Sequence, residues 1–219
     1  MTQAGKSLFF AAAVVALSLA AVTPSHASTI TFYTNQSAFD SAATTSLLED
    51  FEAFTPKDTP FSSITSHGVV YTGFAGVPFP NVWVASPGYN NFGAGVGTTT
   101  TSILTANGDE DILMTFTMTP LAVGFDFYFN GLGPVTLTVT NTAYTSTFTY
   151  GADLDSKGYY GIVSTDPILS IRFTSTDGGR LNTGVDNISI SSVPEVPEPT
   201  TLALLGAGVL GLGRMRKRK

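Results

Sequence analysis

The chain has 219 residues, with 16 acidic and 10 basic side chains and a formal net charge of −6 at pH 7. All sixteen acidic residues but only four of the basic ones lie between positions 40 and 198, which gives that part a net charge of −12. Such a chain offers no basic stripe for phosphate groups, so nucleic acid is excluded as a partner. Because cysteine is absent, disulfides and thiolate chemistry are excluded as well.

The N-terminus has the three parts of a secretory signal. Lys6 precedes an apolar stretch over residues 8–22, and the small residues Ser25 and Ala27 lie at the two positions that determine cleavage. The pattern predicts a signal peptide over residues 1–27, taken by the Sec translocon and cut by signal peptidase between Ala27 and Ser28. The alternative is an uncleaved N-terminal membrane anchor.

One short helix is expected early in the exported part. Asn35 is a suitable N-cap, and Phe39, Ala42 and Ala43 would share one face of the helix that follows. Most of the remaining segments read as strands, because apolar and polar residues alternate along them. The predicted strands are residues 29–33, 47–51, 69–74, 102–105, 114–119, 123–130, 135–140, 146–150, 169–174 and 187–191.

The strands alternate with turn sequences such as Asn107-Gly108, Asn130-Gly131 and Asp177-Gly178-Gly179. This all-β pattern predicts an antiparallel two-sheet sandwich, jelly-roll-like, with one short helix. An immunoglobulin-like sandwich is the alternative topology. With no repeat period and no internal linker, residues 28–193 are expected to form one domain.

Residues 194–219 have a different composition. Pro197-Glu198-Pro199 is followed by an apolar run over residues 200–213 and then by five cations in six residues. Fourteen residues of helix cover about 21 Å, less than the ~30 Å hydrocarbon core, so a buried core helix is the alternative. The cationic block and the four glycines nevertheless favour a membrane helix with its positive end in the cytoplasm. The apolar surface and the stop signal would come from Leu202, Leu204, Leu205, Leu210, Arg214, Arg216 and Lys217.

This order of Pro-Glu-Pro, short Gly/Ala/Leu helix and basic tail resembles a PEP-CTERM sorting segment. The resemblance implies that an exosortase in the membrane recognises Pro197, Glu198 and Pro199. It also implies export in a Gram-negative bacterium that makes exopolysaccharide, through an inner-membrane-tethered intermediate to the cell surface or extracellular matrix.

The sequence offers no catalytic constellation. After signal cleavage His67 is the only histidine, and a Ser-His-Asp triad would have to use it, although Ser66-His67-Gly68 reads as a solvent-facing turn. A glycosidase needs two paired carboxylates. Nothing in the sequence pairs the acidic candidates, which are Asp50, Glu52, Asp126, Asp153 and Asp155. We therefore expect a protein without enzyme activity.

Calcium binding is a better candidate role for the acidic residues than catalysis, because Ca²⁺ prefers oxygen ligands. An early strand that bears a Glu, as in Glu49-Asp50-Phe51-Glu52, beside a final strand that begins with Asp, as in Val185-Asp186-Asn187-Ile188, resembles the arrangement of jelly-roll carbohydrate-binding modules. That resemblance implies that Glu52 and Asp186 hold a structural Ca²⁺. Alternatively, Asp186 only accepts hydrogen bonds from backbone amides. The acidic turns 109–111 and 153–155 are expected to be solvated.

Aromatic rings are the expected glycan contacts, since their faces stack on the CH groups of a sugar ring. Tyr89, beside two asparagines, and Trp83 are the candidates, although Trp83 between two valines also fits a core position. Tyr159 and Tyr160 are expected in a loop, with at most one of them facing solvent. We expect a non-catalytic matrix protein associated with exopolysaccharide. A glycan hydrolase or lyase and a purely structural surface protein are the alternatives.

Overall fold

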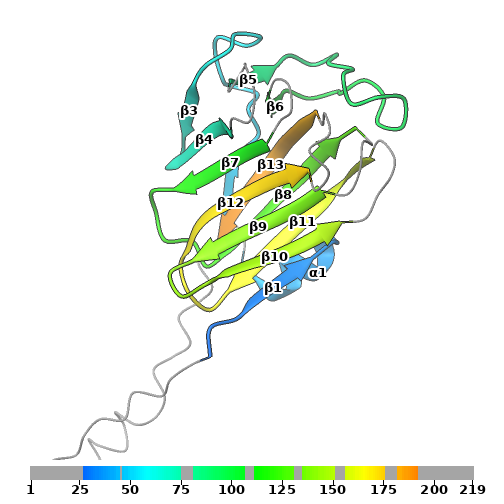
Figure 1. Cartoon of the computed structure of the whole chain (residues 1–219). Coiled ribbons are helices and arrows are strands. Elements are labelled where there is room, and N and C mark those ends of the chain that lie inside the picture. Colours follow the sequence, from blue (N-terminus) through cyan, green and yellow to red (C-terminus); the bar gives the residue numbers. More distant parts are fainter. Residues whose placement is uncertain are drawn as a thin grey trace, which may run out of the picture.

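The computed structural model describes residues 27–44, 46–74, 81–106, 111–130, 135–150, 156–175 and 182–191. They form two antiparallel sheets that pack face to face, with one helix beside the first strand (Figure 1). Among the described residues there are thirteen strands and one helix, α1 (Gln36–Ala42). The strands are β1 (Ile30–Tyr33), β2 (Ser46–Glu49), β3 (Ser63–Ser66), β4 (Val69–Phe74), β5 (Val82–Ala85), β6 (Ile103–Ala106), β7 (Asp111–Phe116), β8 (Ala122–Phe129), β9 (Val135–Asn141), β10 (Thr145–Tyr150), β11 (Ser156–Ser164), β12 (Ile168–Ser175) and β13 (Thr183–Ser191).

The strand order is that of a jelly roll. Sheet A has the order β1-β11-β8-β13-β6-β5, with β2 also paired to β13, and sheet B has the order β10-β9-β12-β7-β4-β3. Strands β6 to β9 pair antiparallel with β13 to β10, and these four pairs fall alternately in sheet A and sheet B. Because this is the pairing of a rolled double Greek key, the jelly-roll topology holds and the immunoglobulin-like alternative does not.

The core lies between the sheets and is rich in aromatic rings. Alternation in β8 turns Phe125, Phe127 and Phe129 inward, where each is at most 3% exposed. Tyr160 of β11 stacks on Phe127 with ring centroids 4.3 Å apart, and Phe173 of β12 closes the cluster from the other sheet, 5.2 Å from Phe125. Burial of rings this large supplies apolar stabilisation to a domain that has no disulfide.

Helix α1 follows the sequence prediction. Asn35 is the N-cap, and its Oδ1 accepts a hydrogen bond from the backbone N–H of Ala38 at 3.1 Å. The ring of Phe39 is fully buried on the outer face of sheet A, where it lies over Gly124 and Gly161. A Cβ atom at Gly161 would lie 2.4 Å from this ring, so the glycine makes room for the helix.

Several predicted boundaries were wrong. Tyr159 and Tyr160, expected in a loop, lie in β11, which together with β3 and β5 was not predicted. The first strand after the helix ends at Glu49, because Phe51 adopts a left-handed backbone with a φ of 56°. β13 begins at Thr183 rather than at residue 187, since a bulge after Asp186 interrupts the alternation that the sequence pattern depends on.

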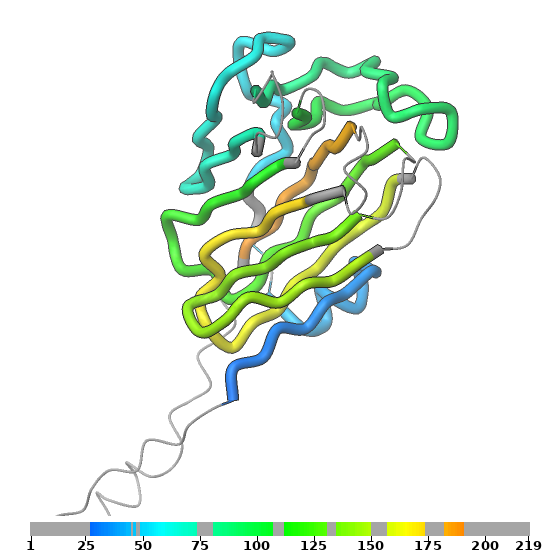
Figure 2. Tube along the Cα trace, in the orientation of Figure 1, coloured from blue at the N-terminus to red at the C-terminus, as the bar shows by residue number. Residues whose placement is uncertain are grey.

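Both ends of the domain lie at the same end of the sandwich. Ile30 of β1 pairs with Ser164, and Ser191 of β13 pairs with Ala122, which is next to Val163 of β11. Figure 2 shows the first and last coloured segments leaving from this side. The predicted signal sequence before Ala27, the segment from residue 194, residues 109 and 110 of the first acidic turn and the whole second acidic turn lie outside the described residues. In the part that the structure describes, no helix is long and apolar enough to cross a membrane.

Candidate functional site

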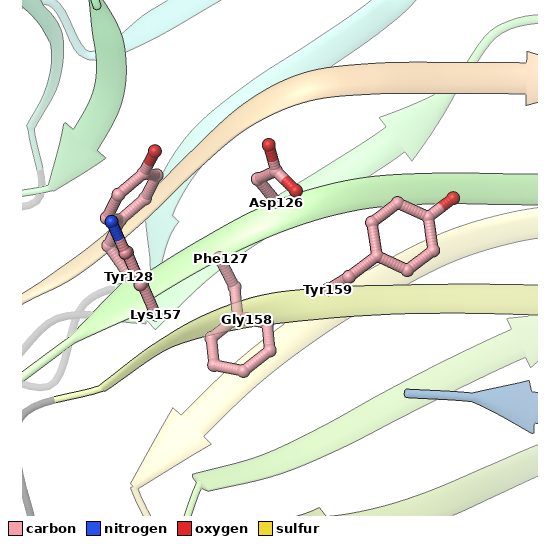
Figure 3. A pocket seen from close by; sticks show the side chains of 6 residues that line it. All are labelled: Asp126, Phe127, Tyr128, Lys157, Gly158 and Tyr159. Carbon is pink, nitrogen blue, oxygen red and sulfur yellow. The ribbon is translucent and has the colours of Figure 1, made fainter. Parts of the chain in front are cut away.

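The outer face of sheet A is covered at two places and open between them. Helix α1 covers it over Gly124 and Gly161, and the segment of residues 86–102 covers it over Gly184, where Phe92 is buried. Between the two lies an open depression of about 370 Å³ (Figure 3). It is lined by Asp126, Phe127 and Tyr128 of β8 and by Lys157, Gly158 and Tyr159 of β11. We call this depression the groove.

Strand alternation explains which side chains enter the groove. Phe127 is directed into the core, so its neighbours Asp126 and Tyr128 project to the outer face (Figure 3). In β11, Tyr160 is buried in the core, so Lys157 and Tyr159 project to the same outer face. Tyr128 and Lys157 are direct partners across the two strands, as are Asp126 and Tyr159. Four polar or aromatic side chains therefore form a compact two-by-two set.

The carboxylate of Asp126 is held in place from β13. Its Oδ2 accepts a hydrogen bond of 2.8 Å from the side-chain amide of Asn187. Asn187 lies at the bulge of β13 and has a φ of 46°, a left-handed conformation that asparagine tolerates well. The bulge thus turns an amide toward the groove and fixes the orientation of an acceptor there.

The two tyrosines are supported from opposite sides. Tyr128 packs on Phe92 of the covering segment with centroids 5.5 Å apart, and Tyr159 packs on Phe39 of α1 at 5.8 Å. Burial raises the pKa of Tyr128 to about 12, and the carboxylates of Asp186 and Asp126 add to the effect. Burial also raises the pKa of Tyr159 to about 12, so both side chains are neutral phenols near pH 7.

The structure brings Trp83 and Tyr89 together. Their rings lie 6.3 Å apart in an edge-to-face arrangement, and Tyr89 in turn contacts Phe92 at 5.3 Å. With the contact between Phe92 and Tyr128, a continuous aromatic row leads from β5 to the groove. Trp83 is half-buried, packed against the small cluster of Ala85, Phe92 and Ile103 rather than inside the main core. Both residues remain candidates for ligand contact.

Asp186 lies beside the groove, next to Asp126 in the register of β13 and β8. It is 1% exposed, and it accepts hydrogen bonds from the backbone N–H of Asn187 at 2.7 Å and from the Thr101 hydroxyl at 2.8 Å. Burial raises the pKa of Asp186 to about 6, with smaller contributions in the same direction from Asp126 and Glu52. The hydrogen bond from Asn187 is of the kind expected if Asp186 serves only to satisfy backbone amides.

Glu52, the second predicted calcium ligand, accepts hydrogen bonds from Ser102, the residue that follows Thr101. Its two oxygens accept hydrogen bonds from the backbone N–H and the hydroxyl of Ser102, at 2.8 and 2.9 Å, and these lower the pKa of Glu52. The two predicted ligands thus contact the adjacent residues Thr101 and Ser102. Across the described ranges, no group of three or more His, Cys, Asp or Glu side chains is arranged to hold a metal ion.

The arrangement around His67 does not form a catalytic triad. Glu49 is buried, and its Oε2 contacts both the Ser66 hydroxyl and His67 Nδ1, the latter at 3.1 Å. Ser66 Oγ also contacts Nδ1, at 3.1 Å, whereas a triad needs the serine and the carboxylate on opposite ring nitrogens. The His67 side chain is 66% exposed, in agreement with the prediction that it faces solvent.

Sequence reasoning missed Tyr128, Lys157 and Asn187. The signal for Tyr128 was present, because the alternation that turns the phenylalanines of β8 inward turns Tyr128 outward with Asp126. Lys157 and Asn187 could not be placed, because β11 was not predicted and the bulge in β13 is invisible in the pattern. Asp153 and Asp155 lie outside the described residues, and Asp50 accepts a hydrogen bond from the backbone N–H of Glu52, which folds it back on its own turn.

Comparison with known proteins identifies the C-terminal segment. Residues 195–219 match the family model "PEP-CTERM protein-sorting motif", so the chain carries this sorting motif. No curated protein sequence matches the chain.

Among solved structures, this chain is similar to a family 29 carbohydrate-binding module, CBM29-2, in a lysine-to-alanine mutant. The two share 16% identity at a TM-score of 0.34, over 64% of this chain and 97% of that one. An aspartate-to-alanine mutant of the same module shares 14% identity with this chain at a TM-score of 0.33. The match covers 83% of this chain and 99% of that one. The catalytic domain of Agl-KA shares 15% identity at a TM-score of 0.31, over 68% of this chain and 32% of that one. At such TM-scores these likenesses identify no ligand for the present chain.

Proposed function

We propose that this protein is an exported, non-catalytic matrix protein that binds glycan in the groove of sheet A. The observation that carries the proposal is the set of Tyr128, Tyr159, Asp126 and Lys157 on one open face. Tyrosine rings supply the apolar faces that a sugar ring stacks on, and the carboxylate and the ammonium group supply an acceptor and a donor for its hydroxyls. Trp83 and Tyr89 would extend the contact along the aromatic row.

The charge distribution favours a neutral glycan over an anionic one. The part of the chain between residues 40 and 198 has a net charge of −12, and the groove contains the carboxylate of Asp126 as well as the ammonium group of Lys157, with Asp186 next to Asp126 on β13. A uronic acid would be repelled by the net negative charge of the domain, whereas a neutral chain of hydroxylated rings is not. We therefore assign neutral polysaccharide as the ligand class.

The tail accounts for delivery. Residues 1–27 would be removed on export, residues 28–193 would form the binding domain, and residues 194–219 would be recognised by an exosortase at Pro197-Glu198-Pro199. The apolar run to residue 213 would hold the intermediate in the inner membrane before release to the cell surface or matrix. A structural Ca²⁺ at Glu52 and Asp186 would tie the segment of residues 50–58 to β13.

Binding is tested with the full chain and a set of soluble hexasaccharides, cellohexaose and mannohexaose as neutral probes and hexagalacturonate as an anionic one. Titration calorimetry should show binding of a neutral probe, and Tyr128→Ala and Tyr159→Ala should each weaken it about tenfold or more, the equivalent of one lost stacking contact. The matched control is Tyr144→Ala, which removes an exposed tyrosine from the opposite end of the domain.

The results separate the proposed function from its alternatives. Equal affinity of the three tyrosine variants would contradict the groove as the site, and absence of binding to any glycan would favour a purely structural surface protein. Shortened sugars would indicate a hydrolase or lyase. Such an enzyme needs two carboxylates that reach the substrate, and Asp186 is too deeply buried to be the second one beside Asp126.

Sorting is tested separately, in cells that make the protein. Glu198→Ala should leave the domain folded yet prevent processing of the tail, because the substitution removes the charged residue of the recognised motif. Intact mass of the recovered protein reports both termini at once. Normal processing and surface display of the variant would contradict a role for Glu198.

A further inference from the structure

The exposed large hydrophobic side chains of the described residues are gathered at one end of the domain. Met118 is 40% exposed, Tyr144 is 37% exposed and Leu169 is 40% exposed, and the described part of the chain has no others in this class. Met118 follows β7, Tyr144 lies in the turn between β9 and β10, and Leu169 lies at the start of β12. Single exposed apolar residues are common on protein surfaces, but here all three share one location.

Backbone hydrogen bonds join the three turns that carry these residues. The N–H of Thr142 donates to the carbonyl of Pro167 at 3.0 Å, and the N–H of Ile168 donates to the carbonyl of Pro120 at 2.8 Å. Residues 117–121, 141–144 and 165–169 therefore form one continuous surface, which we call the apolar end. Asp166 is the single charged residue in these three turns, in a domain that is otherwise strongly acidic.

The chain leaves the domain at this same end. Ser191, the last described residue, pairs with Ala122, which directly follows the first of the three turns. Eight residues, 192–199, separate Ser191 from the apolar run that begins at Thr200. Fully extended, they reach about 30 Å, so a tail anchored in a bilayer keeps the apolar end within that distance of the lipid.

We propose that the apolar end rests on the bilayer while the tail holds the protein in the membrane. The inference rests on the membrane anchoring in the proposed function. Methionine, tyrosine and leucine side chains suit the boundary between head groups and acyl chains, where Tyr keeps its hydroxyl in water. The near absence of charge in the three turns lets them approach lipid without desolvating carboxylates.

Contact at this end holds the groove above the membrane surface. Asp186, the partner of the groove residue Asp126, lies five positions before Ser191 at the apolar end, about 16 Å along the strand. Phe92 and the aromatic row lie over Gly184, near the start of β13. The groove, which opens on the outer face of sheet A, would thus open sideways above the membrane surface, where extracellular polysaccharide can reach it during the tethered stage.

The experiment uses the full chain reconstituted in phosphatidylcholine vesicles. Because the sequence has no cysteine, a single introduced Cys can carry a fluorophore without competing sites. Leu169→Cys and Met118→Cys report on the apolar end, Asn90→Cys reports on the opposite end, where the neighbouring Asn91 carbonyl is bonded to Asn182, and Leu205→Cys reports on the tail. Lipids brominated on their acyl chains quench only labels that reach the hydrocarbon boundary.

We expect strong quenching at position 205, at least twofold quenching at positions 118 and 169, and no change at position 90. Quenching at 205 without any at 118 and 169 would overturn the contact while leaving the anchor intact. No quenching at 205 would overturn the anchor and the contact together, without affecting glycan binding. As a second readout, Leu169→Asp should release the quenching of a label at 118, whereas Asn90→Asp should not.

Discussion

The two outer faces of the sandwich are built from the same strand pattern but differ in what lies on them. On sheet B, β9 and β10 carry threonines in register, and the hydroxyls of Thr140 and Thr145 lie 3.1 Å apart across the strands. Thr138, Thr147 and Thr149 continue this polar surface, which no other described element covers. On sheet A, the corresponding outward positions include Gly124, Gly161 and Gly184, and two segments of the chain pack over them.

The difference shows how a sandwich acquires a site. A β-branched residue fills its place on the sheet, so nothing else can approach the backbone closely. A glycine leaves a hollow, and an aromatic ring from a covering segment enters it, Phe39 at Gly161 and Phe92 at Gly184. The groove is the open strip that remains between two such covers.

Among the substitutions that test this difference between the two sheets, Gly161→Ala should change the free energy of unfolding most. The added Cβ would lie within 2.8 Å of three Phe39 atoms, including its Cβ, so the helix itself must shift. We expect the free energy of unfolding to fall by about 3 kcal/mol, as for overpacking of a tight contact. Urea denaturation checks the value. In a Phe39→Ala background the same substitution should cost much less, and an unchanged cost would contradict the steric explanation.

Asp186→Asn should have the next largest effect. Its pKa of about 6, against an ordinary value near 3.8, means that the folded state binds this proton more tightly than the unfolded one. The charged carboxylate therefore costs stability above pH 6, and that cost disappears as the pH falls toward 4. We expect the variant to be more stable by about 2 kcal/mol at pH 7 and no different at pH 4, measured by urea denaturation in EDTA so that no calcium is bound. A constant difference across this range would contradict the raised pKa.

Gly184→Ala should have a smaller effect on stability but a clear one on the site. The new Cβ would lie 2.6 Å from Cζ of Phe92, the far end of a side chain that can move. We expect a loss of about 1 kcal/mol in unfolding free energy, with weaker glycan binding because Phe92 supports Tyr128. Unchanged affinity would show that the aromatic row does not position Tyr128.

Thr138→Ala, on the uncovered face of sheet B, should have the smallest effect. No covering segment contacts this face, and a surface substitution of this kind changes unfolding free energy by less than about 0.5 kcal/mol. Glycan affinity should be unchanged. A large loss of stability or binding would mean that sheet B carries a function of its own.

Alternation in the sequence was sufficient to place β8 and β9. The inward phenylalanines of β8 and the valines and leucine of β9 predicted both strands and the sandwich, and Asn35 predicted the helix cap. β3 and β5 were missed because they have only four residues each, and the start of β13 was misplaced because its bulge breaks the period. β11 was missed despite its nine residues, because the adjacent Tyr159 and Tyr160 show no alternation of apolar and polar residues. A period of two can be read only where it is maintained over several residues.

The sequence by itself determined the features that depend on local order along the chain: the export signals as predictions, the matched sorting motif, the alternating strands and the absence of cysteine chemistry. The tertiary structure decided which of the many aromatic and acidic residues share a face. Tyr128 and Lys157 are 29 positions apart and meet only because β8 and β11 pair. That pairing is set by burial of the whole core, a cooperative property that no local pattern contains.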